Sequence, residues 1–185
     1  MDMEHYIDEF MKDLPKEFGG MAATPAAEYM FKTRYDDGYL DQETAELFHH
    51  MTAQLIFLGQ RGRPDIRNAV SFLCTRVKSP DNDDYKKRHR LIKYLRKTKF
   101  LRLTMEADRL DQNEWFIDAE FTVHVDMRSH TGAYITFGRG MMNGAFNKQK
   151  INTTSSTVAE VVGVHDNMPA VLWKRYFLQE QFATS

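Results

Sequence analysis

The sequence predicts an α+β protein with a helical first half and a second half that combines a small sheet with one long helix. Apolar residues recur every three or four positions through most of the first hundred residues, which is typical of amphipathic helices. Near residue 100 the spacing changes to alternation, which favours strands, and from Ser155 onward helical spacing returns. We therefore expect about four helices in residues 1–99, and about three antiparallel strands and one long helix in residues 100–185.

Four candidate helices in the first half are separated by turn-forming residues. The apolar stripe of the first consists of Tyr6, Ile7, Phe10, Met11 and Leu14. Asp41 is a good N-cap for the second, and Pro64 fits the first turn of the third. Asp81 or Asn82 can cap the fourth, in which acids precede bases, and this order suits the helix dipole.

The second half contains four short runs that are candidates for strands. They lie at residues 101–104, 115–117, 133–137 and 142–148, with a turn at 138–140 between the last two. In the helix that follows, Pro169 lacks a backbone N–H group and is expected to kink or divide it.

Composition and charge narrow the class of protein. No apolar run approaches the roughly 18 residues of a membrane-spanning helix, and the acidic first ten residues are unlike a secretory signal. The single cysteine excludes an internal disulfide and suits a reducing compartment. A net charge of -1 gives no overall attraction to nucleic acid. We therefore expect a soluble, intracellular, cytoplasmic protein that is not bound to membranes.

Several short motifs occur in the order in which they occur in the Pol polyprotein of copia-type LTR retrotransposons. Residues 62–73 resemble the family's RPDI and AVS.L helix, and residues 91–98 resemble its LRYLKGT segment. The motifs of the second half that resemble the family's RNase H domain are at 117–119, 128–132 (RS.TG), 148–150 (KQK) and 155–160 (SSTEAE). The chain is therefore similar to a stretch from the reverse-transcriptase thumb and connection (1–99) into the first half of RNase H (100–185).

The resemblance implies that Asp118 and Glu160 correspond to two of the acids that hold Mg²⁺ in RNase H. Cutting the RNA strand of a hybrid uses two metal ions held by several carboxylates. By the same resemblance, the polymerase aspartate pair would precede residue 1 and the later RNase H acids would follow Ser185; Asp36-Asp37 is not that pair. We therefore expect an inactive fragment that does not bind Mg²⁺ productively. The alternative is that Asp118 and Glu160 are ordinary solvated carboxylates.

Three further acids are candidates for replacing a missing metal ligand. Glu120 can share a strand face with Asp118, whereas Asp166 points away from Glu160 on the helix and Asp126 falls in a loop. The strand that carries Asp118 is expected to have an unpaired edge. The histidines show no spacing typical of zinc ligands.

The fourth helix carries a basic stripe at helical spacing. Its members are Lys86, Arg90, Lys93 and Lys97. Such a stripe can follow a phosphate backbone, which would make the chain a non-catalytic module that binds an RNA–DNA hybrid or associates with the rest of Pol. The alternative is the solvated face of an ordinary helix.

One departure from the family lies at the start of the long helix. The family has glutamate where this chain has Val158. If Ser155 is the N-cap, this glutamate would complete a capping box, so we expect its absence to weaken the helix start by about 0.5–1 kcal/mol.

Overall fold

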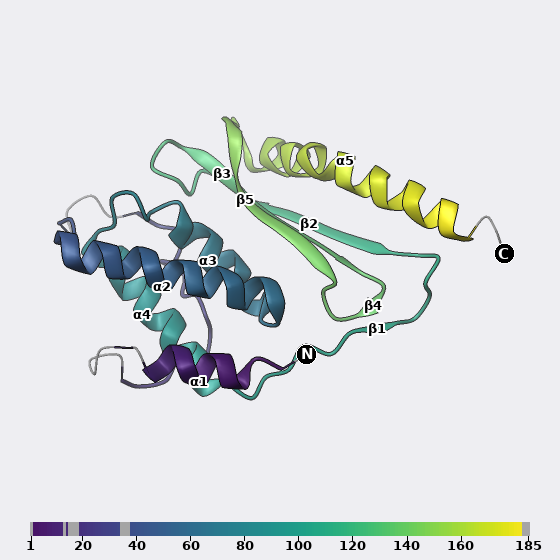
Figure 1. Cartoon of the computed structure of the whole chain (residues 1–185). Helices are drawn as coiled ribbons and strands as arrows, with labels where there is room; N and C mark the ends of the chain where they lie inside the picture. The colour runs from purple at the N-terminus through teal and green to yellow at the C-terminus, as the bar shows by residue number, and fades with distance from the viewer. Residues whose placement is uncertain (1, 13, 15–18, 34–37, 183–185) are drawn as a thin grey trace. The chain divides into compact units, whose positions relative to one another are not determined.

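The computed structural model describes residues 2–12, 14, 19–33 and 38–182 (Figure 1). Its contacts divide the chain into two units, Met1–Leu103 and Thr104–Ser185. Both Pro15, near the expected end of the first helix, and the Asp36-Asp37 pair lie outside the described residues. No helix in the described parts of the chain is long and apolar enough to cross a membrane.

The first unit is helical. Its elements are α1 (Glu4–Lys12), α2 (Gln42–Arg61), the short 3-10 helix η1 (Pro64–Ile66), α3 (Arg67–Cys74) and α4 (Asn82–Lys97). The four expected helices are therefore confirmed. Each contributes fully buried apolar side chains to one core, among them Ile7, Phe48, Leu73 and Leu91.

Both expected N-caps of this unit are present. Asp41 accepts a hydrogen bond from the Thr44 amide at 3.0 Å. Of the two candidates for α4, Asp81 is the cap: it accepts from the Asp84 amide at 2.8 Å, while the Asp84 carboxylate accepts from the Asp81 amide at 3.1 Å. This reciprocal capping box satisfies two amide donors that the first turn leaves without helical partners.

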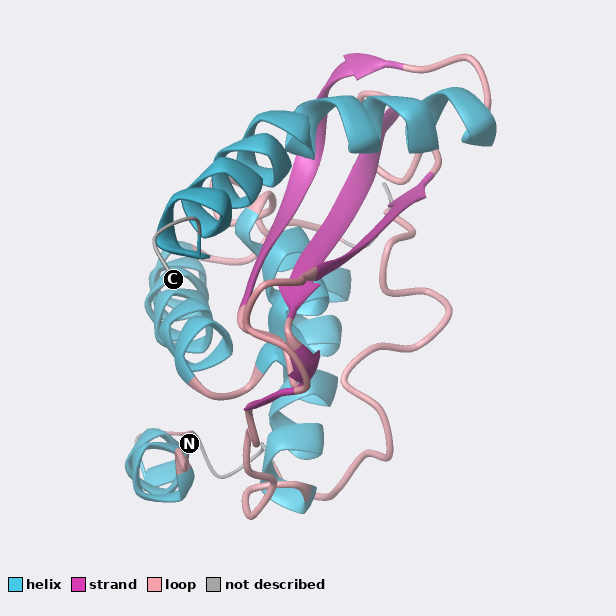
Figure 2. Ribbon diagram, turned by 90° about the vertical axis from the view of Figure 1, so that its right-hand side faces the viewer, coloured by secondary structure: helices cyan, strands magenta, loops and turns pink. Residues whose placement is uncertain are grey.

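The second unit combines two small antiparallel sheets with one helix. Its elements are β1 (Glu106–Ala107), β2 (Glu114–Glu120), β3 (Arg128–Thr136), β4 (Gly138–Arg139), β5 (Asn143–Asn152) and α5 (Ser156–Phe182). The larger sheet has the strand order β2-β3-β5, and β1 pairs with β4. Figure 2 shows α5, the long curved helix, running beside the larger sheet. The predicted α+β class is confirmed at this level.

Two expectations about residues 100–185 differ from the structure. Residues 101–105 form no strand, and the leucine at 101 is half exposed, because alternation alone does not make a strand without a neighbour to pair with. Of the two outcomes expected at Pro169, a kink or a division, division does not occur, because α5 continues through Pro169 to Phe182; Figure 2 shows a curved helix. Pro169 is exposed, so water can satisfy the carbonyl that its missing N–H leaves free.

The two faces of the larger sheet differ in what covers them. A Cβ on Gly163 of α5 would lie 3.1 Å from the Thr131 methyl and 3.6 Å from that of Ile117, so the helix packs closely on this face. Side chains alternate along a strand, so the neighbours of Ile117 on β2 point to the other side. We call this second side the open face; β2 contributes to it Glu114, Phe116, Asp118 and Glu120, all exposed.

Candidate functional site

Asp118 lies on the open face of β2, at an edge of the sheet. Among the described strands β2 pairs with β3 alone, so the expected unpaired edge on this strand is confirmed. The Asp118 carboxylate accepts a hydrogen bond from the amide of Ala119 at 2.9 Å. Backbone hydrogen bonds to β3 use every second residue of β2. The amide of Ala119 belongs to the residues in between, whose amides point toward the free edge. Asp118 therefore shields one donor of that edge.

Glu160 is exposed on the second turn of α5, which covers the other face. It precedes Val171 by eleven residues, about 20° around a helix with 3.6 residues per turn, so the two share a flank. Val171 lines a groove against the start of β2. Asp118 and Glu160 therefore lie on opposite sides of the sheet, Asp118 on the open face and Glu160 on the helix that covers the other face.

The other acids do not complete a metal site with them. Glu120 shares the open face with Asp118, as expected for residues two apart on a strand. Asp126 is occupied by ion pairs with Lys148 at 2.7 Å and Arg128 at 3.4 Å. Within the described ranges, no three histidine, cysteine, aspartate or glutamate side chains gather closely enough to hold a metal ion.

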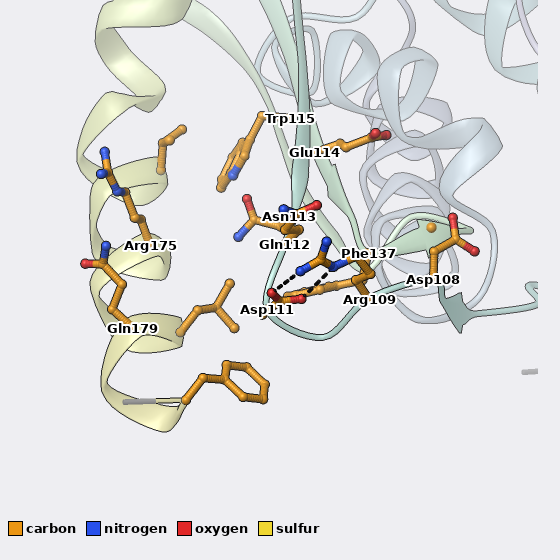
Figure 3. A pocket seen from close by; sticks show the side chains of 14 residues that line it. Asp108, Arg109, Asp111, Gln112, Asn113, Glu114, Trp115, Phe137, Arg175 and Gln179 are labelled. Carbon is orange, nitrogen blue, oxygen red and sulfur yellow. Dashed lines mark hydrogen bonds and ion pairs between the residues drawn. The ribbon is translucent and has the colours of Figure 1, made fainter. Parts of the chain in front are cut away.

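A groove of about 810 Å³ lies between the C-terminal half of α5 and the segment that leads into β2 (Figure 3). Trp115 points into it from the strand, and Arg175 and Gln179 line it from the helix. Arg109 and Asp111 are paired at 2.5 Å on its wall, which balances their charges. The indole N–H of Trp115 has no hydrogen-bond partner in the described part of the protein. Both polar and apolar side chains therefore line the groove.

The basic stripe of α4 is partly covered. Lys86 and Lys97 are exposed at its two ends. Between them, Arg90 donates to the hydroxyl of Thr24 at 2.9 Å, and a Cβ on Gly20 would lie 3.3 Å from the Lys93 side chain. The connector between α1 and α2 therefore lies against the middle of the stripe and leaves its two ends open to solvent.

Two motif segments of the first unit meet in one hydrogen-bond network around the buried Arg63. Arg63 is 1% exposed and binds Asp65 through two hydrogen bonds of 2.9 and 2.7 Å. The same guanidinium donates to the carbonyl of Thr98 at 3.0 Å and to its hydroxyl at 2.6 Å. Tyr94 closes the network by donating to Asp65 at 2.8 Å. These hydrogen bonds connect the C-terminal end of α4 to η1.

Motif residues of the second unit meet in a similar way around Gln149. Its side-chain amide is 2% exposed and donates to the Ala159 carbonyl at 2.7 Å and to the Thr131 hydroxyl at 2.9 Å. One side chain of β5 thus binds both β3 and the first turn of α5. Close by, the hydroxyl groups of Ser129 and Thr153 lie 3.0 Å apart.

A buried histidine pair was missed by the sequence reasoning. His124 Nε2 lies 3.1 Å from His130 Nδ1, and the two residues are 5% and 2% exposed. Burial, with a smaller contribution from the charge of His124, lowers the pKa of His130 to about 4. The signal was available in principle, because a tight turn from β2 into β3 brings positions six apart together. The spacing of the two histidines is not that of zinc ligands, so it gives no signal of a pair unless the turn is placed first.

Comparison of the chain with protein-family models, with curated proteins and with solved structures found no match.

Proposed function

We propose that this chain is a segment of a copia-type retrotransposon Pol polyprotein, in which a thumb or connection region precedes an RNase H-like unit. One observation carries the proposal: Asp118 lies on an edge strand of a small antiparallel sheet, and Glu160 lies near the start of the long helix that packs on this sheet. The two motif networks, around Arg63 and around Gln149, support it, because residues quoted for the resemblance meet in each unit. A reducing, cytoplasmic compartment fits the lone cysteine.

The segment by itself, in this proposal, does not cut RNA–DNA hybrids. Two Mg²⁺ ions about 3.5–4 Å apart stabilise the attacking and leaving oxygens in such reactions, and they need several carboxylates. Asp118 and Glu160 supply two carboxylates, and Glu120 is the nearest further carboxylate along β2. The described residues contain no group of three side chains that could hold a metal ion. Because these two acids lie on opposite sides of the sheet, they do not hold one metal ion between them, and we derive no catalytic step through a metal.

The test is a cleavage assay with a labelled RNA–DNA hybrid and Mg²⁺. We expect no product above that formed by an Asp118→Asn variant, in which one candidate ligand loses its charge without a change of shape. Cleavage by the unchanged chain that disappears in Asp118→Asn would contradict the inactive assignment. Equal background in both proteins, with added RNase H cutting the same hybrid, would support it.

A second candidate function is hybrid binding by α4. The observation that favours it is the exposure of Lys86 and Lys97 at the ends of the stripe. Binding of this kind is sequence-independent and weakens as salt rises, because each phosphate contact releases counterions.

A salt titration of hybrid affinity tests this function. Replacing Lys86 and Lys97 together by glutamate should reduce the slope of log affinity against log salt by roughly two. Arg61 and Lys12 are exposed bases on α2 and α1, and their replacement by glutamate is the matched control. Equal slopes for the two double variants would remove α4 as the binding element.

A further inference from the structure

A separate pocket of the second unit lies on the other flank of α5, between this helix and β5. Its volume is about 360 Å³. Asp166 and Asn167 line it from α5, and Thr131 and Gln149 line it from the strands. Asp166 precedes Val171 by five residues, about 140° around a helix, so this pocket and the groove beside β2 lie on opposite flanks. The pocket therefore has no lining residue in common with β2.

Strand alternation sets Gln149 on the face that α5 covers. Thr131 of β3 is paired with Asn147 of β5, and Thr131 faces the helix. Gln149 lies two residues beyond Asn147 and so points to the same side. Lys148 alternates to the opposite face and pairs with Asp126 at 2.7 Å. The amide of Gln149, and not the ammonium of its neighbour, is therefore presented to the pocket.

The side-chain oxygen of Gln149 is buried without a donor. This side chain is 2% exposed, and both hydrogen bonds seen for it are donated by its nitrogen, to the Ala159 carbonyl and to the Thr131 hydroxyl. Its Oε1 accepts no hydrogen bond in the described residues. A buried acceptor without a donor destabilises a fold unless a bound group supplies one. Because Gln149 lines the pocket, a group bound there can supply that donor.

The other side chains that α5 contributes to the pocket add further acceptors. Asp166 is exposed and pairs with no base in the described part of the chain. Asn167 is 8% exposed, and its side-chain nitrogen donates to the Gly163 carbonyl at 2.8 Å, which leaves its oxygen for a ligand. Lys150 is exposed at the rim, and its long side chain can keep its charge in solvent. A bound anion would face Asp166 and carbonyl oxygens, so the pocket favours a cation that donates hydrogen bonds.

We propose that this pocket binds a guanidinium group. Such a group has five N–H donors in one plane, so it can bond Gln149 Oε1 and the Asp166 carboxylate together. It is more weakly hydrated than an ammonium, which suits a site whose inner acceptor is buried. The volume has room for the group and an alkyl chain. The source is an arginine of another protein or a small guanidino compound. This proposal does not rest on the proposed function and stands if the chain binds no hybrid.

The test titrates N-butylguanidine into the full chain, with n-butylurea and n-butylamine as matched controls. The urea keeps the shape and loses the charge, whereas the amine keeps the charge and loses the planar fork. We expect N-butylguanidine to bind at least about tenfold more tightly than either control. The side-chain amide NMR signals of Gln149 should shift on binding, while those of Gln60, exposed on α2, stay in place. Equal affinity for the three compounds, or unmoved Gln149 signals, would overturn the proposal.

Variants of the protein give an independent arm. Asp166→Asn should weaken the binding of N-butylguanidine roughly tenfold, because a charged acceptor is lost without a change of shape. Glu180→Gln, which removes an exposed acid of α5 outside the pocket, is the matched control and should leave the affinity within about twofold. Both side chains are exposed, so thermal unfolding should be unchanged in both variants. An equal loss of affinity in the two variants would show general attraction to an acidic surface and contradict the site.

A capped glycine-arginine-glycine tripeptide identifies the source of the group. It carries the same guanidinium on a protein backbone. Binding as tight as that of N-butylguanidine would support the site and assign it to an arginine of a partner protein. Tight binding of N-butylguanidine with exclusion of the tripeptide would support the site and assign it to a small guanidino compound. Failure of both to bind would overturn the proposal and leave the cleavage and salt tests of the proposed function unaffected.

Discussion

Two buried polar side chains, Arg63 and Gln149, each bind more than one neighbouring segment through hydrogen bonds. Arg63 shows the strongest case, because its planar guanidinium meets the Asp65 carboxylate through two parallel bonds while two further bonds reach Thr98. Lysine cannot supply this fork, so the arginine of the RPDI motif has a structural reason to be arginine. Gln149 has the corresponding role in the second unit, where its amide bridges a strand and a helix.

The His124–His130 pair makes the second unit sensitive to acid. The pKa of His130 falls to about 4 in the folded protein because burial disfavours its charged form, whereas the unfolded chain has a histidine pKa of about 6.5. Below about pH 6.5 the unfolded state therefore binds more protons, and stability is lost as pH falls toward about 4 at roughly 1.4 kcal/mol per pH unit.

Urea unfolding followed by tryptophan fluorescence at pH 7.5 and pH 5 measures this loss. A His130→Gln variant should lose less stability between the two pH values, because glutamine does not titrate. His165→Gln is the control, since His165 is exposed on α5, and it should retain the full loss. A loss of equal size in the wild-type protein and in His130→Gln would show that other groups cause it.

At the scale of elements, the expectation that Val158 weakens the start of α5 can be tested by substitution. Ser155 is the N-cap, as expected, because the amide of Val158 donates to its hydroxyl at 3.2 Å. Val158 is 40% exposed, so a glutamate there has room to reach back to the amide of the cap. Val158→Glu should therefore stabilise the second unit by about 0.5–1 kcal/mol, through the capping box and the helix dipole.

The matched control is Val161→Glu, on the next turn of α5. Val161 is 62% exposed, and a carboxylate there is past the first turn, so it can neither complete the box nor meet the dipole at full strength. We expect a change within about 0.5 kcal/mol for this variant. Thermal unfolding followed by tryptophan fluorescence compares the two; equal shifts would mean that replacing an exposed valine, not capping, is responsible.

Elements with strong local signals were predictable from the sequence. The helices capped by Asp41 and Asp81 follow from one side chain and a run of apolar spacing, both of which are local. The run at residues 101–104 has the spacing of a strand but no described neighbour, and pairing is a property of the fold that the local pattern does not contain. β1 and β4 are two residues long each, too short for any period to appear.

The candidate site was predictable in its residues and not in its geometry. Asp118 and Glu160 were chosen through the resemblance, and their placement on opposite sides of the sheet depends on which face α5 covers. That choice is made by Gly163, whose missing side chain lets the helix approach Thr131 and Ile117. Nothing in the spacing of the helix singles out this glycine as the point of contact.

At the scale of the whole molecule, the unfolding of the two units can be followed by different signals. Both tryptophans, Trp115 and Trp173, lie in the second unit, whereas every hydrogen-bond partner seen for Arg63 lies in the first. Arg63→Lys removes the fork and leaves Asp65 poorly paired, which should cost the first unit about 2–3 kcal/mol. In urea, the helical circular dichroism of that unit should be lost at lower concentration while the midpoint of tryptophan fluorescence stays unchanged. Arg61→Lys, an exposed base on α2, should move neither signal.

If Arg63→Lys instead shifts the fluorescence midpoint as far as the dichroism, the two units unfold as one, and the stability of the sheet that carries Asp118 depends on the helices before it.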